Sequence, residues 1–278
     1  MSQTPKSWAV PVTRRRRGIF CFMGEEIAQQ VEEQRFYLVE SKARLLPPFA
    51  SIEAEADAKE KECLESPPEY FDPEQWDMSM VYEAAFHRGL EHYDLLQEMR
   101  QRTILGIAAG MYHHFDKSLR VRVARELRQS GWVVGEKTRE QIWRTDWSNL
   151  EALLVAFGWN VPSVTGYENL EALRLVVNAF KHGEGQAFED LKKRFPRFIP
   201  TLTSGSPWAY ADYTHLCITE DHLSTFSKAI ESFWEAIPRQ LSVEEGVDSL
   251  ELPAFYAKAM QKDGVPNVVA SPAASTSP

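Results

Sequence analysis

The stretch LRLVVNAFKHGEG, residues 173–185, combines a clear helical pattern with most of the polar residues of the candidate site. Its apolar residues recur every three or four positions, as they do along the buried side of an α-helix. Gly183 is the residue type that commonly ends a helix. We therefore predict a helix near residues 167–182, which carries one polar stripe formed by Glu171, Arg174, Asn178, Lys181 and His182.

The same helical periodicity recurs along most of the chain, and strand-like alternation is scarce. The pattern therefore predicts an all-α fold, a helical bundle of about five to seven helices with long loops. Besides the striped helix, we expect helices over residues 19–46, from Pro73 to about residue 101, 103–129, 146–157, 186–195 and 219–237. Residues 52–65 are compatible with an exposed helix or a mobile linker, and residues 239–262 stay ambiguous.

These elements divide the chain into three expected parts. Residues 1–18 are polar and form a flexible arm, and residues 19–240 form one helical domain with its core near residues 75–237. Residues 241–278 form a C-terminal extension. Because this extension is poor in core-forming residues after residue 263, we expect it to be largely disordered there.

The composition predicts a folded protein with an acidic surface. The 278 residues carry a net charge of −9, and 44% of them are hydrophobic. This balance disfavours nonspecific binding of nucleic acid by the whole surface, but it leaves room for local basic patches. Two such patches are Arg14 to Arg17 and the run Lys192, Lys193 and Arg194. No apolar run could span a bilayer, and the three scattered cysteines suit a reducing compartment, so we expect a cytoplasmic protein without membrane contact.

The C-terminal half of the polar stripe has residue types suited to proton transfer. Asn178 and His182 are one turn apart and can reach the same small group, whereas Arg174 lies about 12 Å from His182 along the helix axis. The helix C-terminus favours a cationic histidine, and Lys181 adds positive charge, which suits chemistry at a phosphodiester. The plainer interpretation is that Lys181 and His182 only complement the helix end, with Gly183 as its cap.

A second polar set has spacing that a metal site could use. Glu83, His87 and Glu91 follow one another at intervals of four residues on a predicted helix. No HExxH motif accompanies them, and such a set is more often a solvated helix face. We therefore predict no metal site, and nothing in the sequence indicates a cofactor.

The motif and the order of helices over residues 75–237 resemble the HEPN superfamily, the higher-eukaryote and prokaryote nucleotide-binding α-helical domains. Members have a late helix with an Arg-Asn-x-x-x-His motif. Asn178 and His182 match its spacing, whereas Val177 occupies the place of the arginine. The resemblance implies a metal-independent endoribonuclease that works as a homodimer, with His182 as the general acid or base.

Three functional interpretations remain open. The first is a ribonuclease of a bacterial defence or toxin–antitoxin type system, with RNA as substrate and an antitoxin or regulatory protein as partner. Its catalytic residues would be His182, Asn178, Arg174 and Lys181, with Arg174 or Lys181 replacing the motif arginine, and its RNA contacts would be Lys192, Lys193 and Arg194. The second is a noncatalytic HEPN-like binding or regulatory module. The third is a helical bundle that binds a small molecule or nucleotide.

Overall fold

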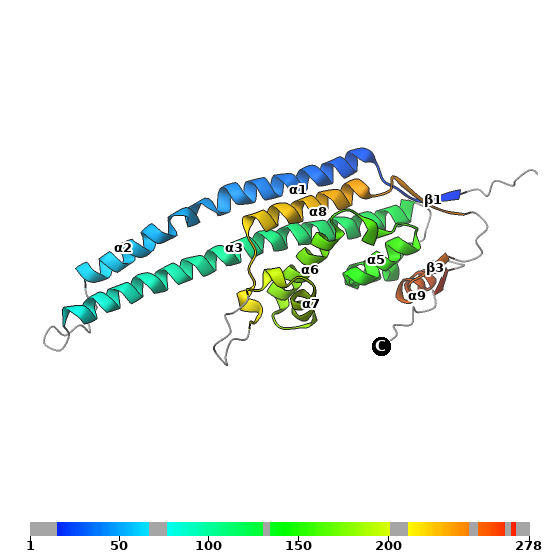
Figure 1. Cartoon of the computed structure of the whole chain (residues 1–278). Helices are drawn as coiled ribbons and strands as arrows, with labels where there is room; N and C mark the ends of the chain where they lie inside the picture. The colour runs from blue at the N-terminus through cyan, green and yellow to red at the C-terminus, as the bar shows by residue number, and fades with distance from the viewer. Residues whose placement is uncertain are drawn as a thin grey trace, which may run out of the picture. The chain divides into compact units, whose positions relative to one another are not determined.

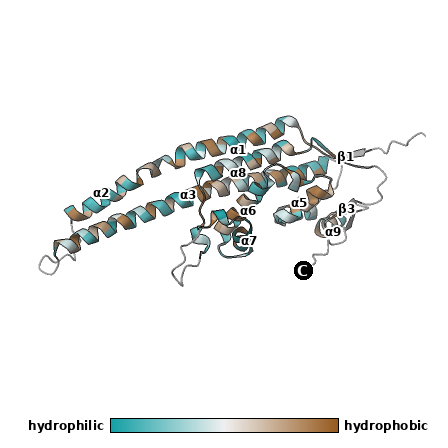
Figure 2. Cartoon of the chain, in the orientation of Figure 1, coloured by the Kyte–Doolittle hydropathy of each residue, from teal (hydrophilic) through white to brown (hydrophobic). Residues whose placement is uncertain are grey.

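The computed structural model describes residues 16–66, 77–129, 134–200, 211–244, 250–264 and 268–270. Helices make up most of these residues and the strands among them are short (Figure 1), which confirms the all-α class. Most helices carry both hydrophobic and hydrophilic residues (Figure 2), as expected where one side packs and another meets solvent. No helix in these ranges has the length and apolar character required to cross a membrane.

The chain folds into two compact units, each built from segments that are distant in the sequence. The first unit comprises Met1–Ala28, Asp116–Val164 and Glu235–Pro278. The second comprises Gln29–Phe115 and Thr165–Trp234. The sequence predicted an arm, one domain and an extension instead, because it cannot show that the two ends of the chain join its middle in one unit.

The second unit holds the long helices and the polar stripe. Its helices are most of α1 (Gly24–Leu45), α2 (Ile52–Glu65), the first part of α3 (Met78–Gln129), α6 (Tyr167–His182), α7 (Gln186–Arg194) and most of α8 (Glu220–Ala236). Short 3-10 turns lie at Pro47–Ser51, Pro196–Phe198 and Tyr213–His215. The helices predicted over residues 167–182, 186–195 and 219–237 are thereby confirmed. Of the two interpretations of residues 52–65, the helix is correct, since these residues form α2.

Within this unit, α1, α8 and α3 run alongside one another (Figure 1). Phe115 of α3 meets Phe233 and Trp234 of α8 edge to face, with ring centroids 4.9 and 5.7 Å apart. A side chain at Gly110 of α3 would collide with Tyr37 of α1, so this glycine permits the close approach of the two helices. The core of the unit also contains the buried residues of α6, among them Leu170, Leu173, Val176 and Val177.

α3 is one continuous helix of 52 residues, where we predicted two. The predicted boundary near Arg102 is wrong because the residues around it support a helix. Arg102 forms an ion pair with Glu98 one turn earlier, and Thr103 Oγ1 donates a 2.8 Å hydrogen bond to the carbonyl oxygen of Met99. The i,i+4 ion pair stabilises the helix locally, and the Thr103 hydroxyl finds its partner within the same helix, so the chain continues without a break.

In the first unit, strand β1 (Arg16–Cys21) pairs antiparallel with β2 (Gln240–Glu244). The prediction of a helix from residue 19 is therefore wrong at its start, and α1 begins at Gly24. The same strand corrects the predicted arm at residues 16–18, while residues 1–15 lie outside the described residues. An isolated strand of six residues gives too little alternation to be recognised without its partner.

This unit also contains the start of α1 and the second part of α3. Its other elements include α4 (Glu136–Arg144), α5 (Trp147–Ala156), α9 (Ala254–Lys262) and strands β3 (Leu250–Leu252) and β4 (Val268–Ala270), which pair in parallel. α5 agrees with its prediction: Asp146 caps it and accepts a 2.9 Å hydrogen bond from the N–H of Asn149. Within the stretch after residue 263 that we expected to be largely disordered, Val268–Ala270 form β4, and residues 265–267 and 271–278 lie outside the described residues.

α4 is a helix that the sequence analysis missed. Its first turn is capped by Asp263, which follows α9 and accepts hydrogen bonds from the N–H groups of Thr138 and Lys137 at 2.7 and 3.2 Å. Any side chain at Gly135 would overlap the Asp263 carboxylate, so glycine is required at the start of α4. At the other end, the buried Arg120 donates to the carbonyl oxygens of Ile142 and Thr145 at 2.6 and 2.8 Å.

Candidate functional site

The candidate site is carried by α6, whose ends are set by two glycines. The helix begins after Gly166 and ends at Gly183, and both have a positive φ, +82° and +70°. The N–H of Gly183 donates to the carbonyl oxygen of Ala179 at 2.9 Å and so closes the last turn. The ring of Tyr213 lies about 3.5 Å from where a Cβ on Gly183 would stand, so an aromatic side chain borders this end of the helix.

The structure separates the polar stripe into an inner and an outer part. The inner part is Glu171, which is only 5% exposed, together with Arg174. Arg174 Nε and Nη2 donate to the two carboxylate oxygens of Glu171 at 2.9 and 3.0 Å. Arg194 of α7 donates to the same carboxylate at 3.1 Å. The inner part is therefore a buried acid held by two guanidinium groups, which packs α6 against α7.

This arrangement determines the state of Arg174. Burial lowers the pKa of its guanidinium, but the hydrogen bonds and the charge of Glu171 outweigh burial and leave the pKa above its ordinary value. The guanidinium of Arg174 is thus held by a carboxylate inside the unit, which it shares with Arg194. It is not available to a substrate without breaking a bidentate ion pair, which is among the stronger polar interactions in proteins.

The outer part of the stripe is Asn178, Lys181 and His182. Asn178 is half-buried, and Lys181 and His182 are exposed. No hydrogen bond or ion pair of these three side chains occurs within the described part of the chain. Hollows of about 340, 420 and 480 Å³ open on the described surface, and none of these three is lined by Asn178, Lys181 or His182. None of these three hollows therefore offers the His182 imidazole a concave site for a phosphodiester.

The place of the motif arginine is occupied by a core residue. Val177 is 1% exposed and lies among the buried side chains of α6. A cation at this position would point into hydrocarbon, where an unpaired charge is strongly unfavourable. In this chain the position before Asn178 therefore cannot supply the charge that the HEPN-type reaction needs.

Two of the three basic residues of α7 are engaged by partners within the second unit. Lys192 forms an ion pair with Glu189 at 3.1 Å and lies 5.3 Å from the ring of Phe188, while Arg194 holds Glu171. Lys193 is exposed. Of the three RNA contacts that the sequence predicted, two therefore have partners within the second unit.

The residues considered as metal ligands form short-range pairs. His87 Nε2 lies 3.9 Å from Glu83 Oε1, and Glu91 accepts a 3.0 Å hydrogen bond from Arg88. Among the residues that the structure describes, no group of three or more metal-ligating side chains comes together.

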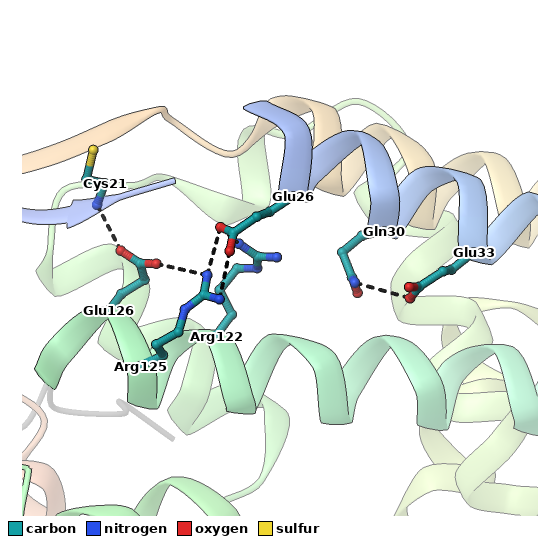
Figure 3. A network of polar contacts seen from close by, with 7 residues as sticks. All are labelled: Cys21, Glu26, Gln30, Glu33, Arg122, Arg125 and Glu126. Atoms are coloured by element: carbon teal, nitrogen blue, oxygen red, sulfur yellow. Dashed lines mark hydrogen bonds and ion pairs between the residues drawn. The ribbon is translucent and has the colours of Figure 1, made fainter. Parts of the chain in front are cut away.

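A charged network in the first unit is a further polar feature that the sequence did not reveal (Figure 3). Glu26 of α1 accepts hydrogen bonds from Arg122 and Arg125 of α3 at 2.7 and 2.8 Å, and the buried Glu126 accepts one from the Cys21 N–H at 3.0 Å. The hydrogen bond from Arg125 is the main cause that lowers the pKa of Glu26, against the opposing effect of burial. The network joins β1 and the start of α1 to α3. Its only sequence signal is the basic second half of α3.

Comparisons with known proteins leave the family open. No protein-family model, curated protein or solved structure matches this chain. The resemblance to HEPN domains thus stays a prediction that depends on the Asn178–His182 spacing and the helix order.

Proposed function

We propose that this chain is a noncatalytic binding or regulatory module of the HEPN-like type. The observation that carries the proposal is the ion pair between Arg174 and the buried Glu171. A metal-independent ribonuclease needs a cation near its asparagine and histidine to stabilise the developing phosphorane charge. With Arg174 held by Glu171 and Val177 in the core, the last turn of α6 retains only Lys181 for that role besides His182 itself.

A metal-independent endoribonuclease of a defence or toxin–antitoxin type system is the second candidate. It is favoured by the exposure of Lys181 and His182 at one end of α6, with Asn178 one turn away. In this alternative, Lys181 takes the part of the missing arginine, and a second copy of the chain completes the site. The two candidates make opposite predictions for RNA cleavage.

The deciding experiment incubates purified protein with total RNA in the presence of EDTA. The wild type is compared with His182→Ala, which removes an exposed side chain and should leave the fold intact. For a noncatalytic module, the two proteins give the same low background of cleavage. Chelator-resistant cleavage by the wild type that is lost in His182→Ala would overturn the proposal in favour of the nuclease. Toxicity on expression that His182→Ala relieves would point the same way.

A further inference from the structure

A hollow of about 480 Å³ opens along the contact between α4 and α9 in the first unit. Both helices line it with residues at the same spacing, i, i+3 and i+7. On α4 these are Lys137, Glu140 and Arg144, and on α9 they are Phe255, Lys258 and Lys262. The buried sides of the two helices pack together behind these residues. The hollow thus has one row of long polar side chains from each helix and one aromatic ring.

The charge of this hollow is strongly positive in a chain whose net charge is −9. Four of its lining residues are cations and one is an acid. Glu140 is paired with Arg144 and Lys137 at 2.9 and 3.5 Å, which leaves the α9 row uncompensated. Lys258 and Lys262 are exposed, and no ion pair of either occurs among the described residues. A concave surface of one sign focuses the electrostatic potential and concentrates ions of opposite sign.

The nearby Asp263 does not line this hollow. Its carboxylate is directed at the N-terminus of α4, where it accepts hydrogen bonds from Thr138 and Lys137. The same cap fixes the end of α9 to the start of α4 and so holds the two basic rows in place. Phe255, half-buried at the first turn of α9, adds an aromatic face to the hollow.

We propose that the α4–α9 hollow binds a single-stranded nucleic acid, with phosphates on Lys258 and Lys262 and a base stacked on Phe255. Rows of cations that track a backbone, interrupted by an aromatic ring, are the usual means of binding single strands. The volume suits one or two nucleotide-sized groups. An acidic polypeptide would use the cations but gain little from the ring. This inference rests on the proposed function, because it names the partner of the binding module. No residue of α6 lines the hollow.

The test measures fluorescence anisotropy of a labelled oligouridine and of a labelled oligothymidine, each of about twelve nucleotides. The wild type is compared with the double variant Lys258→Glu/Lys262→Glu. We expect this change to weaken binding by about tenfold or more and to reduce the salt dependence of log Kd by about 1.4. Phe255→Leu should weaken binding by about tenfold while leaving the salt dependence unchanged, because stacking carries no charge. Thermal melts of each variant check the fold.

The matched control is Lys117→Glu/Lys228→Glu, which makes the same charge change at exposed positions of α3 and α8 that lie in neither candidate site. Retention of binding in this control supports the α4–α9 hollow, whereas loss of binding there and not in the Lys258/Lys262 variant overturns it. Absence of wild-type binding at about 50 mM salt also overturns it, as does equal competition by polyglutamate. RNA cleavage that depends on His182, with binding still dependent on Lys258 and Lys262, would refute the noncatalytic module and leave the hollow standing.

Discussion

The Asp263 carboxylate accepts a 2.7 Å hydrogen bond from the backbone N–H of Thr138, although 125 residues separate the two in the chain. A residue that follows α9 therefore serves as the N-terminal cap of α4. Helices usually take their cap from the residue just before them, but here that residue is Gly135, which has no side chain. The stability of α4 consequently depends on the position of α9.

We expect Asp263→Ala to lower the free energy of unfolding by about 1–2 kcal/mol, because two N–H groups of α4 lose their acceptor. Urea denaturation followed by circular dichroism measures the loss. Lys258→Ala on the exposed side of α9 is the control and should change the midpoint little. Equal midpoints for the Asp263 variant and the wild type would show that the cap contributes nothing.

The same residue should make stability depend on acid pH. Burial raises the pKa of the Asp263 carboxyl, but the hydrogen bonds from Thr138, Lys137 and Gly135 outweigh burial. The pKa therefore lies below its ordinary value. Since the folded pKa is depressed, the stabilisation is present above the ordinary pKa and is lost as pH falls through the folded value. The difference in stability between the wild type and Asp263→Ala should therefore shrink below about pH 4.

Glu26→Gln tests the network of Figure 3. The variant removes the charge that holds Arg122 and Arg125, and Arg122 is buried. We expect a loss of about 1–2 kcal/mol, measured by urea denaturation at neutral pH and low salt. Glu25→Gln, an exposed neighbour with the same chemical change, should have almost no effect. A loss of the same size in both variants would mean that general charge, and not the network, is responsible.

Arg174→Met separates a structural from a catalytic role for this residue. The change leaves the buried Glu171 with Arg194 as its remaining partner, so we expect a loss of about 2–3 kcal/mol in stability. Lys181→Met, on the exposed side of α6, is the control and should unfold like the wild type. If Arg174→Met unfolds with the same free energy as the wild type, the ion pair with Glu171 does not contribute to stability.

Gly183→Ala should destabilise the second unit by about 1–3 kcal/mol, because a residue with a Cβ is strained at φ +70° and ψ −141°. Gly106→Ala is the contrasting variant. Gly106 lies within α3, where an added Cβ meets no atom within 4 Å, and alanine there should stabilise the helix by about 0.5–1 kcal/mol. Differential scanning calorimetry would show opposite shifts of the melting temperature, and shifts of the same sign would contradict this account.

The sequence predicts those helices whose signals are local. α5 has its cap at Asp146, and α6 has its apolar periodicity and the terminal Gly183, so both were found. α4 was missed because its cap is Asp263, and β1 because its partner β2 lies near the other end of the chain. Where the stabilising contact is remote in sequence, a local pattern carries no trace of it.

For the candidate site, too, the local pattern carries only part of the information. Helical spacing placed five polar residues on one stripe but could not tell which of them face the core. Glu171 and Arg174 are turned inward, where they form an ion pair with each other, whereas Lys181 and His182 remain at the surface. The basic α4–α9 hollow could not be found from the sequence, since its two rows lie more than a hundred residues apart.

The pairing of Cys21 with Gln240 also constrains how this protein can be made. During translation β1 leaves the ribosome long before β2 has been synthesised. Until then, the backbone N–H and C=O groups of β1 lack the hydrogen-bond partners that β2 supplies. Contacts between such distant segments close late and slowly. An unpaired strand edge is a template for pairing with other chains, so the nascent protein passes through a period in which aggregation competes with the last step of folding.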